Sequence, residues 1–158
     1  MDDGRRVREI LVVEDNPLDV QVIREALASA VPSTVVHAVG DGDDAVRFLC
    51  AEGRFTSSRR PDLVLLDLRL PGRSGRDVLR WIRGDEAVRC IPVVVLSSSN
   101  SPAEIEDVYC LGANCYVVKP PDLAALTAAV EAIARLWLVT AALPEARFGK
   151  PADPADRG

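Results

Sequence analysis

Five short aliphatic runs, separated by stretches with helical periodicity, constrain the fold of this chain more than any other feature. Aliphatic and β-branched runs of this length are typical of strands buried on both faces of a sheet. Between them, apolar residues recur at intervals of three and four, which indicates helices with one buried face. The alternation predicts an α/β fold, a doubly wound five-stranded parallel sheet with right-handed crossovers. The runs lie at residues 10–13, 35–39, 63–66, 92–97 and 115–118.

The segments between the runs carry turn and helix signals. Residues 17–32 begin with proline, end near proline and have apolar residues at helical spacing, so they predict a helix. Residues 40–42, Gly-Asp-Gly, predict a turn, and residues 53–61 form a long polar and basic connection. The last apolar stripe, at residues 123–137, predicts one long helix.

A length of 158 residues suits a single domain, and 48% apolar residues are enough for a packed core. We expect that domain at residues 9–143, after an N-terminal tail at residues 1–8. Residues 144–158 are rich in Pro, Ala, Asp and Gly, which is typical of a flexible C-terminal tail.

The composition argues against several classes of function. A formal net charge of -5 provides no broad basic field, so we expect no nucleic-acid binding. We expect no membrane partner, because no apolar run approaches the roughly 20 residues of a spanning helix. The spacing of the cysteines suits neither a zinc site nor a disulfide framework, and the N-terminus does not resemble a signal peptide. These features predict a cytoplasmic protein with reduced thiols at Cys50, Cys90, Cys110 and Cys115.

Polar side chains stand where the predicted strands end. Glu14 and Asp15 follow the first run, Asp67 follows the third, Ser97 ends the fourth and Lys119 follows the fifth. In a doubly wound sheet these ends meet at one edge, where ligands bind. Three carboxylates gathered there repel one another unless a cation neutralises them, and oxygen ligands favour a hard divalent ion. Each acid alone is typical of a loop or a helix cap, but together they predict a Mg2+ site.

Four phrases carry a family resemblance: VVEDNP at 12–17, LLDLRLPGRSG at 65–75, VVVLSSS at 93–99 and CYVVKP at 115–120. In order and spacing they resemble the receiver domains of two-component response regulators, over about residues 8–138. The resemblance implies a flavodoxin-like receiver fold and a Mg2+-dependent transfer of a phosphoryl group from a histidine kinase to Asp67. Such a domain is a phosphoacceptor in signalling rather than an enzyme with a separate substrate, and it can also catalyse its own dephosphorylation.

The resemblance also implies a role for each remaining residue of the site. Glu14 and Asp15 would be the acidic metal pair, and the backbone carbonyl of Arg69 would be a further metal ligand. Ser97 and Tyr116 would be the switch pair. Lys119 would bind the phosphoryl group, and the peptide bond before Pro120 would be cis. The chain departs from the family pattern at Pro121, which adds a second proline after Lys119 and restrains the backbone of Pro120.

Three further features are similar to single-domain regulators that pair with bacterial phytochrome histidine kinases. They are the long connection at 53–61, the phrase NCYVVKP at 114–120 and the stretch LWLVTAALP at 136–144. The similarity implies a kinase of that type as partner and output through protein contacts. The surface formed by residues 105–111, 115–118 and 123–138 is the expected output face and the candidate surface for a homodimer.

Two other readings of the sequence stay open. A flavodoxin-like binder of small molecules shares this strand pattern, but the acidic loop at residues 14–17 would repel a cofactor phosphate. A receiver-like adaptor that is never phosphorylated is the second reading. The presence of an acceptor, an acidic pair, a switch hydroxyl and a lysine argues against it.

Overall fold

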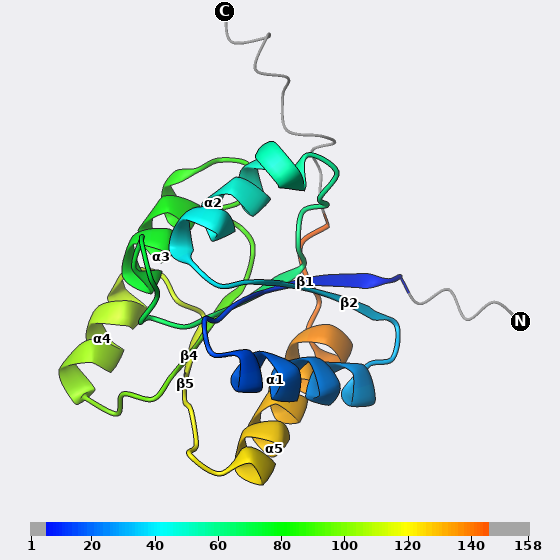
Figure 1. Cartoon of the computed structure of the whole chain (residues 1–158), viewed down its shortest axis with the longest axis vertical. Helices are drawn as coiled ribbons and strands as arrows, with labels where there is room; N and C mark the ends of the chain where they lie inside the picture. Colours follow the sequence, from blue (N-terminus) through cyan, green and yellow to red (C-terminus); the bar gives the residue numbers. More distant parts are fainter. Residues whose placement is uncertain (1–5, 146–158) are drawn as a thin grey trace, which may run out of the picture.

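The structure is a computed structural model that describes residues 6–145. Strands and α-helices alternate along this part of the chain (Figure 1), as the sequence predicts. Apart from two short helical segments of other types, the elements are β1 (Arg8–Val13), α1 (Pro17–Ala30), β2 (Thr34–Val39), α2 (Gly42–Cys50), β3 (Leu63–Leu66), α3 (Gly75–Gly84), β4 (Val93–Ser97), α4 (Pro102–Cys110), β5 (Cys115–Val118) and α5 (Leu123–Ala134).

The strands form one parallel sheet in the order β2-β1-β3-β4-β5. The chain leaves β1 for one edge of the sheet and returns to β3 on its other side, so the strand order reverses between β1 and β3. Ligand sites of doubly wound sheets lie outside the carboxyl ends of the strands at such a reversal. The predicted fold class is confirmed, and the topology places the loops after β1 and β3 side by side.

Helices cover both faces of the sheet, which explains the continuous apolar character of the strands. Figure 1 shows α1 and α5 on one side and α2, α3 and α4 on the other. Alternate side chains of one strand enter the two layers: Ile10 and Val12 pack with α1 and α5, while Leu11 and Val13 pack with α2 and α3. A strand buried on both faces therefore needs apolar residues at every position.

Apart from shifts of one or two residues at other element ends, the observed elements differ from the predicted ones at four places. β1 begins at Arg8, within the predicted tail, and Gly42 begins α2 instead of a turn because the Asp41 carboxylate accepts the Asp44 N–H at 2.7 Å and caps the helix. The connection after α2 contains a 3-10 helix at Gly53–Phe55. The predicted last helix divides into α5 and a wider π-helical segment at Arg135–Thr140. The predicted C-terminal tail lies outside the described residues from residue 146 onward.

The expectation that no segment approaches membrane-spanning length is corrected by the last helix. Leu123–Thr140 is 18 residues long with a mean hydropathy of 1.6, so by length and composition it could cross a bilayer. However, Leu126, Val130 and Ile133 of this helix lie in the core against β1, β3 and β4. The core helix of a soluble domain meets the same criterion, so this feature is weak support for a membrane span.

Gly75 sets the distance between α3 and the loop after β3. A Cβ atom at this position would lie 2.1 Å from the carbonyl oxygen of Asp67 and 2.6 Å from the Cα atom of Leu68. The Gly75 N–H donates to the carbonyl of Leu68 at 3.0 Å. The backbone that carries Asp67 therefore rests directly on the first residue of α3, and only glycine leaves room for this approach.

We predict that Gly75→Ala lowers the free energy of unfolding by about 1–3 kcal/mol, because the added methyl group overlaps backbone atoms. Gly84→Ala is the matched control at the opposite end of α3, where nothing lies within 4 Å of the added atom. That variant should be neutral or more stable by up to about 1 kcal/mol. Urea unfolding followed by circular dichroism measures both, and equal effects of the two substitutions would contradict the prediction.

Candidate functional site

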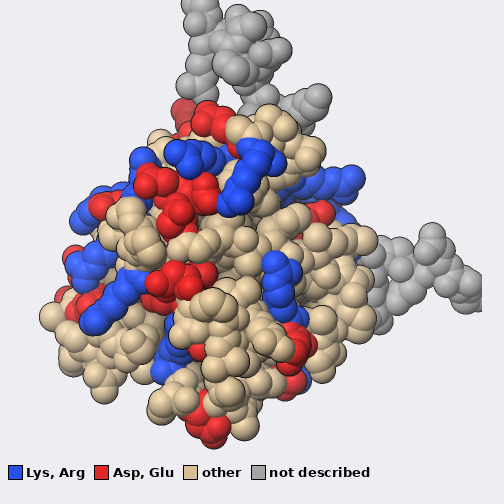
Figure 2. All heavy atoms as spheres, in the orientation of Figure 1, with Lys and Arg blue, Asp and Glu red and all other residues tan. Residues whose placement is uncertain are grey.

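Three carboxylates meet at the carboxyl ends of β1 and β3. The ladder of the sheet fixes their backbones, since the Glu14 N–H donates to Val39 at 3.0 Å and the Asp67 N–H donates to Val13 at 2.9 Å. One oxygen from each of Glu14, Asp15 and Asp67 lies within 4.8 Å of the other two. Glu14 and Asp67 are 4% and 9% exposed, whereas Asp15 is open to solvent. Figure 2 shows acidic atoms gathered over the end of β1 near the centre of the viewed face.

This set of donors fits a hard divalent cation. Carboxylate oxygens are the ligands that Mg2+ and Mn2+ favour, and Mg2+ keeps several water molecules when it binds. The exposed Asp15 leaves the site open to solvent on one side, so such waters can be accommodated. Neither thiol nor imidazole groups belong to the cluster, which argues against zinc.

Lys119 lies in the midst of the acidic groups. Its ammonium nitrogen is 2.6 Å from Glu14 Oε2, 3.0 Å from Asp19 Oδ2 and 3.2 Å from Asp67 Oδ2. The backbone of Lys119 is fixed as well, because its N–H donates to the Ser97 carbonyl at 2.7 Å. The side chain is only 11% exposed. The sequence-predicted Glu14, Asp15, Asp67 and Lys119 are thus brought together in one place.

Burial and charge shift two pKa values at this site. Desolvation is the largest influence on Glu14 and raises its pKa to about 7, aided by the nearby charge of Asp67 and opposed by the hydrogen bond from Lys119. Burial alone would lower the pKa of Lys119, but its hydrogen bonds to Glu14 and Asp19 and the charge of Asp67 raise that pKa above its ordinary value. Lys119 therefore remains a cation, while Glu14 gains or loses a proton near neutrality.

Ser97 and Tyr116 lie on the neighbouring strands β4 and β5. Ser97 is buried and its hydroxyl accepts the Ser99 N–H at 3.4 Å. The Tyr116 hydroxyl donates to the Ser99 carbonyl at 2.8 Å and lies 3.5 Å from a carboxylate oxygen of Glu104. Both predicted switch residues therefore contact the loop between β4 and α4. Arg69 lies two residues after Asp67, and its N–H donates to Asp67 Oδ1 at 3.3 Å.

Sequence reasoning missed several residues that support the site. Asp19 contacts Lys119 from the first turn of α1, and Asn16 caps this helix by accepting the N–H groups of Leu18 and Asp19. On the other side, Arg76 of α3 reaches Asp107 of α4 at 2.5 Å and Glu104 at 3.8 Å. The sequence signal for Asp19 was its place in the first turn of the helix that follows Glu14 and Asp15.

The prediction of a cis peptide at Pro120 is wrong. No peptide bond is cis among residues 6–145, so the bond between Lys119 and Pro120 is trans. A trans bond is the more stable form before proline in the absence of a compensating contact. Pro121 follows directly and disfavours a helical conformation at Pro120.

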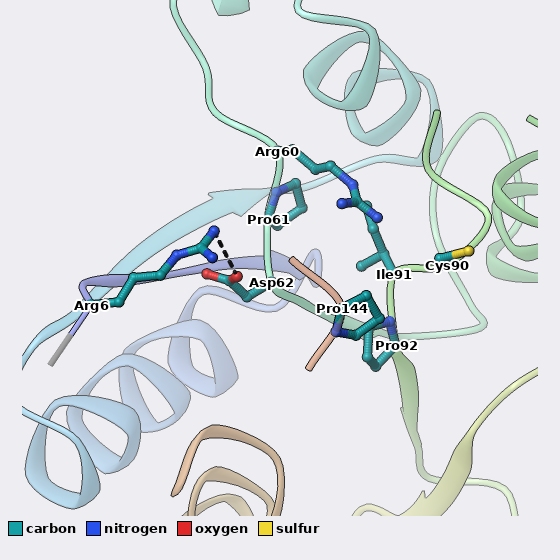
Figure 3. Close-up of a pocket in the computed structure, with 8 residues that line it drawn as sticks. All are labelled: Arg6, Arg60, Pro61, Asp62, Cys90, Ile91, Pro92 and Pro144. Carbon is teal, nitrogen blue, oxygen red and sulfur yellow. Dashed lines mark ion pairs between the residues drawn. The ribbon is translucent and has the colours of Figure 1, made fainter. Parts of the chain in front are cut away.

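A separate hollow lies at the opposite end of the sheet (Figure 3). Most of its lining comes from segments that precede strands, with Arg6 before β1, Arg60 and Asp62 before β3, and Cys90 before β4, and Pro144 completes it. Its volume is about 10 Å³, which is room for roughly one water molecule. Asp62 there accepts the Glu9 N–H at 2.9 Å and pairs with Arg6 at 3.5 Å, so the hollow belongs to the structural anchoring of the amino-terminal strand ends.

Comparison with known families and proteins identifies the family to which the chain belongs. The model of the response regulator receiver domain matches residues 10–131. The chain belongs to this receiver family. The match extends from β1 into α5, and it contains all the residues that converge at the carboxyl end of the sheet.

Among its similar structures, the phosphorylated cyanobacterial phytochrome response regulator RcpA is 43% identical. The similarity covers 89% of this chain and 100% of that one, with a TM-score of 0.85. Response regulator Rcp1 of Synechocystis is 37% identical over 145 residues, which cover 92% of this chain and 99% of Rcp1. Its Mn2+-bound structure has a TM-score of 0.83, covering 87% of this chain and 99% of that one. The protein is thus a response regulator receiver homologous to the phytochrome regulators.

A third receiver structure bears on the metal. The receiver domain of a sensor histidine kinase from Pseudomonas aeruginosa is 33% identical, with a TM-score of 0.64, and covers 84% of this chain and 98% of that one. That domain holds a magnesium ion in its active-site cleft. Related receivers therefore bind Mn2+ or Mg2+, and this chain has an acidic cluster of the kind such ions require.

We predict that Mg2+ binds more tightly as the pH rises from 6 to 8. Glu14 has a pKa of about 7, so it is mostly protonated at pH 6 and mostly a carboxylate at pH 8. Because a metal ligand must be deprotonated, the affinity should increase roughly tenfold over this range. Isothermal titration calorimetry at pH 6, 7 and 8 measures it. An affinity that does not change with pH would show that Glu14 is not a ligand, or is already charged at pH 6.

Proposed function

We propose that Asp67 accepts a phosphoryl group from the phosphohistidine of a histidine kinase, in a reaction that requires Mg2+. The observation that carries this proposal is the meeting of three carboxylates and one ammonium group at the switch point of the sheet. A flavin or nucleotide phosphate would meet the acidic loop after β1, so the small-molecule reading has no support from this geometry.

In this proposal the side chains of the site position and neutralise the reacting groups. A carboxylate oxygen of Asp67 attacks phosphorus, and the bond from phosphorus to the kinase imidazole nitrogen breaks in line with the new bond. The Lys119 ammonium neutralises charge on a phosphoryl oxygen. Glu14, Asp15, Asp67 and the backbone carbonyl of Arg69 would hold Mg2+, which would supply positive charge that lets the two anions approach. Later loss of the phosphoryl group to water would regenerate Asp67.

We infer a bacteriophytochrome-type kinase as the partner. The similarity to RcpA and Rcp1 over almost their whole lengths supports this inference, as does the 38% identity to a bacteriophytochrome response regulator that covers 89% of this chain and 84% of that one. We also infer that the protein works in the cytoplasm and signals through another protein rather than through nucleic acid. A receiver-like adaptor that is never phosphorylated is the second candidate, although no structural feature favours it.

We infer that Ser97 and Tyr116 report phosphorylation to the face formed by α4, β5 and α5. A new phosphoryl oxygen on Asp67 would draw the Ser97 hydroxyl toward it, and the loop that holds the Tyr116 hydroxyl at Ser99 would move with Ser97. This loop leads into α4, so the movement would alter the surface of that face. If phosphorylated Ser97→Ala still changes its self-association or partner binding as wild type does, the switch assignment is wrong.

We infer that the same face forms a homodimer. Tyr109 of α4, Val118 of β5 and Leu123 of α5 are 47%, 42% and 43% exposed. Large apolar side chains grouped on one face favour a protein contact, and a twofold axis would bury each patch against its copy.

The proposed chemistry predicts that the purified chain gains one phosphoryl group from acetyl phosphate only when Mg2+ is present. Asp67→Asn should gain none, because an amide oxygen is a poor nucleophile. Asp62→Asn is the matched control, a substitution of the other buried aspartate that flanks β3. Intact mass measures the gain of the phosphoryl group. Modification of Asp67→Asn, or of wild type without Mg2+, would contradict the proposal.

The dimer inference predicts that Val118→Lys shifts the protein toward monomer, because two lysines would face each other across the twofold axis. Val35→Lys is the control: Val35 is 39% exposed on β2, at the other edge of the sheet. Sedimentation equilibrium with and without acetyl phosphate gives the dissociation constants. A monomeric wild type under both conditions, or equal effects of the two substitutions, would exclude a dimer through this face.

A further inference from the structure

The three carboxylates around Lys119 differ in whether they also belong to the cluster that can hold a cation. Glu14 and Asp67 also belong to the cluster that can hold a cation, together with Asp15. Asp19 lies outside that cluster, yet its carboxylate is 3.0 Å from the Lys119 ammonium. A cation bound there would compete with Lys119 for the oxygens of Glu14 and Asp67. Asp19 would then be the carboxylate that remains for Lys119 alone.

The fold holds both ends of this ion pair. Asp19 is the third residue of α1, where Pro17 begins the helix and the Asn16 side chain accepts the Asp19 N–H at 3.3 Å. Lys119 is held from the other direction by its N–H bond to the Ser97 carbonyl. The two side chains are 16% and 11% exposed, so water screens their attraction only partly.

We propose that Asp19 is a positioning residue for phosphoryl transfer, which keeps the Lys119 ammonium beside Asp67 when the cation occupies Glu14 and Asp67. This inference rests on the proposed function, since it assigns a role within the same reaction. The ammonium stays 3.2 Å from an oxygen of Asp67 in the present arrangement, which is where charge on an incoming phosphoryl group would need it. Without Asp19, the Lys119 ammonium would have no carboxylate partner outside the cation cluster. It would then lie beside Asp67 for only part of the time.

A different role for Asp19 is purely structural. An acidic side chain in the first turn of a helix interacts favourably with the helix dipole, so Asp19 could serve only to stabilise α1. That role predicts a lower melting temperature after substitution and no change in the maximal rate of phosphorylation. The positioning role predicts a lower maximal rate whatever the effect on stability.

The experiment measures the rate of phosphorylation of the full chain by acetyl phosphate across a series of Mg2+ concentrations, using intact mass. It compares wild type, Asp19→Asn, Asp19→Glu and Glu25→Gln. Glu25 lies on α1, is exposed and contacts Gln21, so its substitution removes one charge from the same helix. We expect Asp19→Asn to lower the maximal rate roughly tenfold without weakening Mg2+ binding. Asp19→Glu should recover part of the rate, and Glu25→Gln should match wild type.

Two results would overturn the positioning role. The first is an Asp19→Asn variant that reaches the wild-type rate at saturating Mg2+. The second is an equal loss of rate in Glu25→Gln, which would indicate a general effect of charge. Asp19→Ser replaces Asp19→Asn if the latter does not fold. A wild-type chain that gains no phosphoryl group at all would instead overturn the proposed function, so the two failures are distinguishable.

Discussion

The mutual repulsion of carboxylates at the end of β1 and β3 is the constraint on which the rest of the site depends. Glu14, Asp19 and Asp67 share the ammonium group of Lys119, and Asp15 adds a further carboxylate beside Glu14 and Asp67. The raised pKa of Glu14 reduces the excess of negative charge. The exposed Asp15 leaves the cluster accessible to a divalent cation, which would neutralise the rest. A site that holds excess negative charge at rest needs a cation before a phosphoryl anion can approach it.

Most of the fold could be predicted from the sequence because β3 and β4, in the middle of the sheet, are buried at every position and are apolar except at Ser97. Continuous runs such as 63–66 leave little choice between strand and loop. The end of the last helix could not be predicted, because the π-helical turn at Arg135–Thr140 preserves an apolar stripe that an α-helix would also show. The bond before Pro120 was predicted from family resemblance and not from a local physical requirement, and there the prediction failed.

The site residues that stand at the ends of strands could be predicted, since the topology of a parallel sheet gathers the carboxyl ends of its strands at one edge. This rule found Glu14, Asp15, Asp67, Ser97 and Lys119. It could not find Asp19, which reaches the site from a helix, or Arg76, whose partners Glu104 and Asp107 lie on another helix. The sequence carries no signal that Gly75 is a packing position, and only the close approach of α3 to the backbone of Asp67 and Leu68 explains why a side chain cannot stand there.

The most direct test of the central claim is a crystal structure of the chain with Mg2+ and beryllium fluoride, a stable mimic of a phosphoryl group. We expect the mimic on a carboxylate oxygen of Asp67, Mg2+ on Glu14, Asp15 and Asp67, and Lys119 between the mimic and Asp19. A mimic bound to another residue, or a cation bound away from these three carboxylates, would contradict the claim.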